Sequence, residues 1–174
     1  MTHFVWNTAF DTTMKFEGNY QCMYNDRGNW TSGKVGEGEL KGTKYGISAM
    51  AYPALDIKNL SYEQAKEIYK KDYWDRCKCD FIPDALSIAL FDFAVNSGIN
   101  RAVKYLQTCL DIKADGIIGN QTIGACNRMP TKTILEKFIQ SRFDFLKSLK
   151  TWKDFGSGWG RRVNTLKKVC EEYL

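Results

Sequence analysis

Hydrophobic residues recur along most of the chain with the period of an α-helix. Near the N-terminus, Trp6, Phe10 and Met14 recur every four residues, which predicts an amphipathic helix that ends near Glu17. The pattern then changes, because seven of the 14 glycines fall between residues 18 and 46. Glycine favours turns and close backbone approach, so this segment is predicted to form loops and short hairpin strands.

The remaining chain returns to helical spacing. Ser61 and Gln64 form a capping box, which predicts a second helix that runs to about Trp74. Residues 85–95 are apolar nearly all round, as expected for a helix buried in the centre of a protein, and Gly98 ends it. Further helices are predicted near residues 100–110, 120–128, 132–149 and 159–173.

These elements predict an α+β fold that is mostly α-helical. The glycine-rich segment 18–46 is a small β-hairpin insert within a first region that covers residues 1–96. Residues 97–174 form a second helical region, which we expect to pack with the first as one unit.

Composition excludes several kinds of enzyme. The chain has a single histidine, His3, at the end of the chain, so Ser-His-Asp, Cys-His and His-ligated zinc chemistry have no placed imidazole. General acid and base chemistry therefore falls to Asp, Glu, Tyr or Lys. The net charge of +5 suits an anionic partner without selecting one. The last helix carries its basic residues as two pairs only, which argues against nucleic acid.

The six cysteines are expected to be reduced thiols rather than a disulfide framework. The first fifteen residues contain no basic region followed by an apolar stretch, and no run is long enough to span a bilayer. We therefore expect synthesis in a cytoplasm and no stable membrane insertion.

Two carboxyl groups flank the start of the glycine-rich segment. Glu17 stands where the first helix ends, and burial against Phe16 and Tyr20 would keep it protonated near neutral pH, as a general acid requires. Asp26 lies in the loops, where a carboxylate stays solvated and ionised. Two carboxyls in different environments are typical of glycosidases. By spacing alone, a Glu at a helix end such as Glu17 is more often a solvated surface group.

Motifs in both halves of the chain, taken in order, resemble those of glycoside hydrolase family 108. In the first half they are Phe16-Glu17-Gly18-Asn19-Tyr20, Asn25-Asp26 and Gly42-Thr43-Lys44-Tyr45-Gly46-Ile47-Ser48. In the second half, residues 91–98, 102–107 and 115–122 resemble the predicted peptidoglycan-binding segment of that family, and Gly158-Trp159 with Arg162 resembles its C-terminal motif. The resemblance thus implies a catalytic region over residues 1–96 and a helical region over residues 97–174 that is similar to a peptidoglycan-binding segment. The family contains peptidoglycan-cleaving N-acetylmuramidases, including phage endolysins.

The resemblance implies a lysozyme-like fold in which the hairpin lobe faces the helical lobe across a cleft. It implies hydrolysis of the β-1,4 bond between N-acetylmuramic acid and N-acetylglucosamine. Glu17 would protonate the leaving oxygen, and Asp26 would activate water or stabilise positive charge at the anomeric carbon. No metal or organic cofactor is expected.

Other residues gain candidate roles from the resemblance. Trp30 would stack on a sugar ring from an exposed loop, or pack in a core. Thr43 and Tyr45 would orient water or Asp26, or pack on the hairpin. Asn96 would bind an N-acetyl group, or cap its helix. For Asp92, on the buried helix, satisfying a donor in the core is favoured over reacting with substrate.

Two other readings share this sequence. A lytic transglycosylase would use Glu17 as acid and then base, and a non-catalytic peptidoglycan-binding protein would keep Glu17 as a structural residue. In the favoured reading the chain is a monomer with peptidoglycan as its substrate. It would accumulate in a host cytoplasm and reach the periplasmic cell wall through a holin-like pore.

Overall fold

The computed structural model describes residues 2–174 of the chain, with side chains from Phe4 onward. The side chain of His3 lies outside the described residues. The chain forms two compact units, of which the first contains residues 2–12 and 70–174 and the second contains residues 13–69. The expected division between residues 96 and 97 falls inside the first unit.

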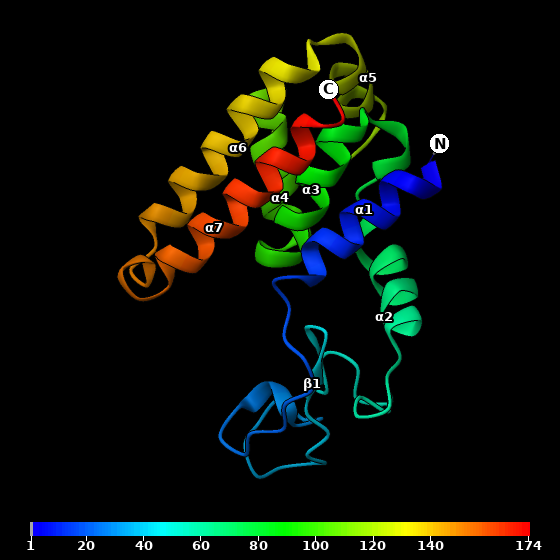
Figure 1. The fold of residues 1–174 in the computed structure, drawn as a ribbon, viewed down its shortest axis with the longest axis vertical. Helices are drawn as coiled ribbons and strands as arrows, with labels where there is room; N and C mark the ends of the chain where they lie inside the picture. Colours follow the sequence, from blue (N-terminus) through cyan, green and yellow to red (C-terminus); the bar gives the residue numbers. More distant parts are fainter. Residues whose placement is uncertain (1) are drawn as a thin grey trace. The chain divides into compact units, whose positions relative to one another are not determined.

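The first unit is a helical bundle around one buried helix. Its main helices are α1 (Thr2–Met14), which ends in the second unit, α3 (Asp84–Ser97), α4 (Ile99–Cys109), α5 (Asn120–Arg128), α6 (Thr131–Ser148) and α7 (Trp152–Glu171). Every residue from Ala85 to Ala94 is buried, as its apolar sequence predicts. Helices α4, α6 and α7 pack against α3, and α6 and α7 run side by side (Figure 1).

A buried charge cluster ties three of these helices together. Asp92 of α3 forms ion pairs with Arg142 of α6 and Arg162 of α7, with N–O distances of 2.7 and 2.9 Å. Burial disfavours the carboxylate, but the two guanidinium groups outweigh it and hold the pKa of Asp92 at about 2. The hypothesis that Asp92 satisfies donors in the core is confirmed.

The second predicted helix begins at its capping box. The Gln64 amide donates to Ser61 Oγ at 3.1 Å, and the Ser61 amide donates to Gln64 Oε1 at 2.9 Å. Helix α2 (Tyr62–Tyr69) continues into a π-helical turn, η2 (Lys70–Trp74), so the helix reaches Trp74 as predicted.

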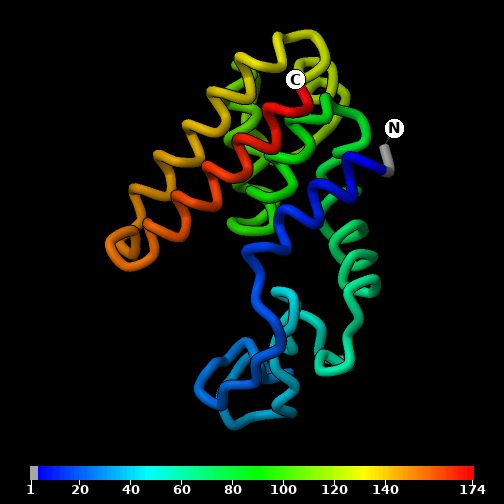
Figure 2. Tube along the Cα trace, in the orientation of Figure 1, coloured from blue at the N-terminus to red at the C-terminus, as the bar shows by residue number. Residues whose placement is uncertain are grey.

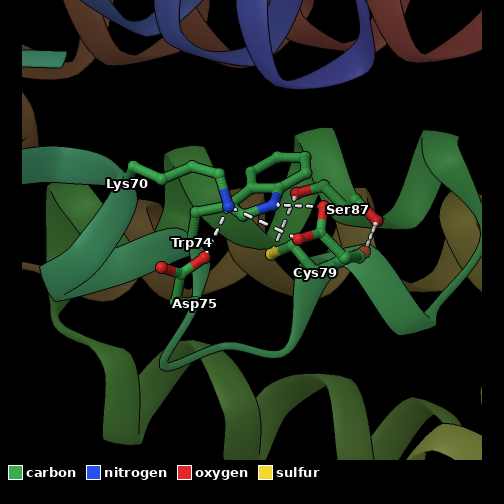
Figure 3. A network of polar contacts seen from close by, with 6 residues as sticks. Lys70, Trp74, Asp75, Cys79 and Ser87 are labelled. Atoms are coloured by element: carbon green, nitrogen blue, oxygen red, sulfur yellow. Dashed lines mark hydrogen bonds and ion pairs between the residues drawn. The ribbon is translucent and has the colours of Figure 1, made fainter. Parts of the chain in front are cut away.

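A polar network holds the connection from η2 to α3, which includes the short helix η3 (Cys79–Phe81). Lys70 Nζ lies 3.4 Å from Asp80 Oδ2, and Trp74 Nε1 donates to Asp80 Oδ1 at 2.8 Å. Ser87 donates its hydroxyl to the carbonyl of Cys79 at 2.7 Å (Figure 3). These contacts fix the segment that leads into the buried helix.

The second unit is built mainly from loops. Its sheet has two short antiparallel strands, β1 (Thr43–Lys44) and β2 (Ile47–Ser48), and a 3-10 turn, η1 (Arg27–Asn29), precedes them. The trace of residues 18–46 is otherwise irregular (Figure 2). The predicted combination of loops and a short hairpin is confirmed.

Helix α7 begins at Trp152, whereas the sequence predicts a start near Trp159. The prediction is wrong because it reads the glycines at 156–160 as a break. A Cβ atom at Gly156 would lie 2.6 Å from the Trp152 indole. The glycine therefore makes room for an aromatic ring on the helix surface, and the helix continues through it.

All six cysteines are free thiols, and five of them are buried. Burial raises the pKa of Cys126 to about 11 and that of Cys170 to about 12, so both thiols stay protonated. Across residues 2–174, no helix is both long and apolar enough to cross a bilayer. Within the same residues, no group of three or more His, Cys, Asp or Glu side chains is placed to hold a metal ion.

Candidate active site

Glu17 stands just beyond the end of α1, in the loop unit. The helix ends at Met14, and the Glu17 amide donates to the Met14 carbonyl at 3.2 Å in the turn that follows. The side chain is half-buried. Glu17 is thus three residues beyond the last residue of the helix.

The β1–β2 turn lies directly against this glutamate. Tyr45 and Gly46 form a two-residue turn with φ values of 53° and 75°, as in the type I′ turns that join tight hairpins. The Tyr45 amide donates to the Gly18 carbonyl at 2.9 Å. This bond fixes the hairpin turn to the main chain next to Glu17.

Gly46 brings its main chain close to two functional groups. A Cβ atom there would lie 2.7 Å from Glu17 Oε2 and 2.6 Å from the Tyr69 hydroxyl oxygen. Tyr69 is buried, and its hydroxyl donates to the Tyr45 carbonyl at 2.8 Å. The glutamate carboxyl and the tyrosine hydroxyl therefore both pack on a position that only glycine can occupy without displacement.

Asp26 is anchored by both of its carboxylate oxygens. One oxygen accepts the Gly28 amide at 2.9 Å and caps η1, and the other accepts Gln21 Nε2 at 3.1 Å. The residue is half-buried. The structure thus places a carboxylate in a fixed orientation at the start of the turn.

Behind Asp26 lies a polar network that includes the predicted residue Thr43. Asn29 is fully buried, and its Oδ1 accepts the Thr43 hydroxyl at 2.8 Å and Gln21 Nε2 at 3.1 Å. Asn29 Nδ2 donates to Gln21 Oε1 at 2.7 Å. Thr43 therefore bonds to Asn29, and Gln21 is the side chain that reaches Asp26.

The expectation that Trp30 is exposed on its loop is wrong. Only 8% of its surface is exposed, and its indole nitrogen donates to the Tyr24 carbonyl at 2.8 Å. The Tyr24 ring packs edge-on against it at 5.1 Å between centroids. Trp30 is thus a core residue of the loop unit, and little of its ring is available to a sugar.

The two other predicted binding residues have defined surroundings. The Tyr45 ring packs edge-on against Tyr62 at 5.7 Å, with Lys44 Nζ at 5.4 Å from the Tyr45 ring centroid. Asn96 lies in the last turn of α3, in the helical unit, where its Oδ1 accepts the Ser97 hydroxyl at 3.2 Å. The cap of α3 is Gly98, so Asn96 does not fill that role.

The turn between α4 and α5, which resembles part of a peptidoglycan-binding segment, is organised by a buried glutamine. Gln107 Nε2 donates to Asp115 Oδ1 at 2.9 Å and to the Ile117 carbonyl at 3.0 Å. Gln107 Oε1 accepts the Gly116 amide at 2.9 Å. These bonds explain Asp115 and Gly116 as residues that form a turn between two helices.

Sequence reasoning missed four residues that define the candidate site, namely Gln21, Asn29, Gly46 and Tyr69. Gly46 lies inside the motif of residues 42–48, and the freedom of glycine to adopt a positive φ is the sequence signal that could have marked it. Tyr69 belongs to the apolar face of a helix, where it reads as core. Nothing in the local pattern marks Gln21 or Asn29, because their role depends on contacts across the loops.

Comparisons with known proteins bear on this site. Residues 10–98 match the family model described as Glycosyl hydrolase 108, and these residues include both candidate carboxyls. The structure of Brucella abortus SagA is similar, with a TM-score of 0.79 and 29% sequence identity over 97% of this chain and 94% of that chain. Comparison with curated proteins finds no match. The structural similarity confirms the predicted lysozyme-like, mostly helical fold.

Proposed function

Because the chain belongs to the glycosyl hydrolase 108 family and is accordingly a glycoside hydrolase that acts on peptidoglycan, we propose that it is an endolysin-type muramidase. The proposed reaction adds water across the β-1,4 bond between N-acetylmuramic acid and N-acetylglucosamine. One product gains a reducing end, and the other regains the hydroxyl of the leaving oxygen.

Glu17 is proposed as the general acid. The observation that carries this role is the packing of its half-buried carboxyl on the Gly46 main chain, within a hairpin turn bonded to Gly18. The rigid turn holds the group in one place, as proton transfer requires.

Asp26 is proposed as the second carboxylate. Its two anchoring bonds, from Gly28 and Gln21, hold the carboxylate in one orientation, and its charge would stabilise the positive charge that develops at the anomeric carbon. Asn accepts the Gly28 bond through its one side-chain oxygen, but its NH2 group would face Gln21 Nε2 and cannot accept from it, so this bond is lost together with the charge. We therefore expect Asp26→Asn to reduce turnover and to lower the free energy of unfolding by about 1 kcal/mol.

Product analysis on purified peptidoglycan tests the reaction. A muramidase releases new reducing ends on N-acetylmuramic acid. A lytic transglycosylase leaves 1,6-anhydro ends without consuming water, and a non-catalytic binding protein releases no products from walls that it still binds. Anhydro ends or an absence of products from folded protein would contradict the proposal.

The same proposal includes a biological setting. The protein would be a monomer of bacteriophage origin that accumulates in the host cytoplasm and lyses the host from the periplasm after release through a holin-like pore. The net charge of +5 supports attraction to an anionic cell wall.

A further inference from the structure

The loop unit contains a pocket whose lining does not include the candidate acid. It has a volume of about 330 Å³, within the usual range of ligand pockets, and Tyr20, Lys41, Ala54, Asp56, Ile57 and Lys58 contribute to its lining. Every one of these residues belongs to the unit formed by residues 13–69. The pocket is therefore defined within one compact body.

Contacts within the unit hold the walls of this pocket in place. Gly42, with φ of 87°, lies so close to Tyr20 that a Cβ atom would be 2.7 Å from the ring. Lys41 Nζ donates to the Pro53 carbonyl at 2.8 Å, which ties Lys41 to the residue that precedes Ala54. Asp56 accepts the Asn59 side-chain amide at 2.9 Å. A pocket fixed in this way needs little ordering when it binds a ligand.

The lining of the pocket combines apolar, aromatic and charged side chains. The exposed Ala54 and the half-buried Leu40 provide a small apolar surface beside the partly exposed Tyr20 ring, whereas the Ile57 side chain is itself fully buried. Lys41 and Lys58 add two positive charges and Asp56 adds one negative charge, so the lining itself carries a net positive charge. Lys41 Nζ also lies 3.3 Å from the largely exposed Glu39. Small side chains that carry carboxylates would complement the net positive lining, whereas an uncharged sugar would leave its charge uncompensated.

We propose that this pocket binds the stem peptide of peptidoglycan, which is joined to the lactyl group of muramic acid and itself carries alanine methyl groups and free carboxylates. The proposal rests on the proposed function, since it assigns a part of the same substrate. The peptide carboxylates pair with Lys41 and Lys58, and a methyl group packs beside Leu40 and Ala54. Binding of the peptide then adds affinity that is absent for a glycan without peptides.

Two variants test the pocket by different routes. Ala54→Trp fills it without changing the charge, and Lys58→Glu reverses one charge on its lining. Lys34→Glu is the matched control, because Lys34 is an exposed lysine of the same unit, paired with Glu37 at 3.5 Å and outside the pocket lining. Each variant is assayed for release of reducing ends from intact peptidoglycan and from the same material stripped of peptides by an amidase.

The expected result is a loss of kcat/KM for both pocket variants that is about three- to tenfold larger on intact than on stripped peptidoglycan. Lys34→Glu should change the rates on both substrates equally. Equal losses on both substrates for the pocket variants, or no loss at all, would overturn the proposal.

A binding measurement separates this proposal from the proposed function. Isotope-labelled wild-type protein is titrated with the free stem tripeptide, with inorganic phosphate as a control for simple anion binding. Shifts of the Tyr20, Ala54 and Ile57 amides with the tripeptide, which are absent in Ala54→Trp, support the pocket even if no reducing ends form on either substrate. Shifts with phosphate alone, or none at these amides, would refute it.

Discussion

Replacing Gly46 with alanine tests the geometry that surrounds Glu17. The new Cβ atom would lie 2.7 Å from Glu17 Oε2 and 2.6 Å from the Tyr69 hydroxyl, and real Cβ atoms do not come so close to other atoms. The backbone at φ of 75° also costs alanine about 1–2 kcal/mol. Both groups must therefore shift, and a displacement of about 1 Å of a catalytic group costs as much as 100-fold in rate.

Gly36→Ala is the matched control for this substitution. Gly36 has φ of 83°, so alanine meets the same backbone strain, but its only close neighbour is the Tyr24 hydroxyl at 3.4 Å. We expect Gly36→Ala to lose about 1–2 kcal/mol of stability, and Gly46→Ala to lose more because Glu17 and Tyr69 must also shift. Each kcal/mol lowers the melting temperature by about 2–4 °C.

The assay is the wall-clearing rate per folded molecule, read beside thermal unfolding. Gly46→Ala should be about 10- to 100-fold slower than wild type, and Gly36→Ala should retain wild-type turnover. Equal turnover of the two variants would refute the argument that Gly46 positions the glutamate.

Three further predictions follow from the packing. Trp30→Ala should destabilise the protein by about 3–5 kcal/mol in denaturant unfolding, because the buried ring is lost together with its bond to Tyr24. A loss below about 1 kcal/mol would show that Trp30 is not a core residue. Asp92→Asn should cost about 3–5 kcal/mol, because Arg142 and Arg162 stay buried without their counter-charge. In the wild type, the pKa of Asp92 is lowered to about 2, so the stability that Asp92 contributes is complete above about pH 5 and is lost as the pH falls from about 4 towards 2. This loss at acid pH should be absent from the Asp92→Asn variant when unfolding is measured as a function of pH. Dithiothreitol should leave activity unchanged, because all six cysteines are thiols, and inactivation with the mass change of a lost bridge would show otherwise.

Helices were predictable wherever local signals agree with burial. The capping box at Ser61 begins α2 where expected, and the apolar run at 85–95 is the buried helix. The start of α7 was not predictable in this way, because Gly156 is explained by the Trp152 ring packed on it. The sequence alone does not show the ring that packs on Gly156, so the glycine was interpreted as a residue that ends the helix.

The candidate site was predictable in its carboxyl groups and less so in what holds them. Glu17 and Asp26 follow from motif positions, but Gln21 reaches Asp26, and Asn29 reaches Gln21, through contacts across loops that have no regular period. The burial of Trp30 has the same origin. Its neighbour Tyr24 is six positions earlier, and only the folded loop brings the two rings together.

The central claim is that the Glu17 carboxyl supplies the proton in glycosidic cleavage. Glutamine keeps the shape of the side chain and removes its acidic proton, so Glu17→Gln isolates the chemistry from the packing. The decisive measurement is the rate of release of reducing ends from purified peptidoglycan by the folded variant and by wild type. We predict a loss of about 10²- to 10⁴-fold with an unchanged melting temperature, and a variant that remains within a fewfold of the wild-type rate would contradict the account.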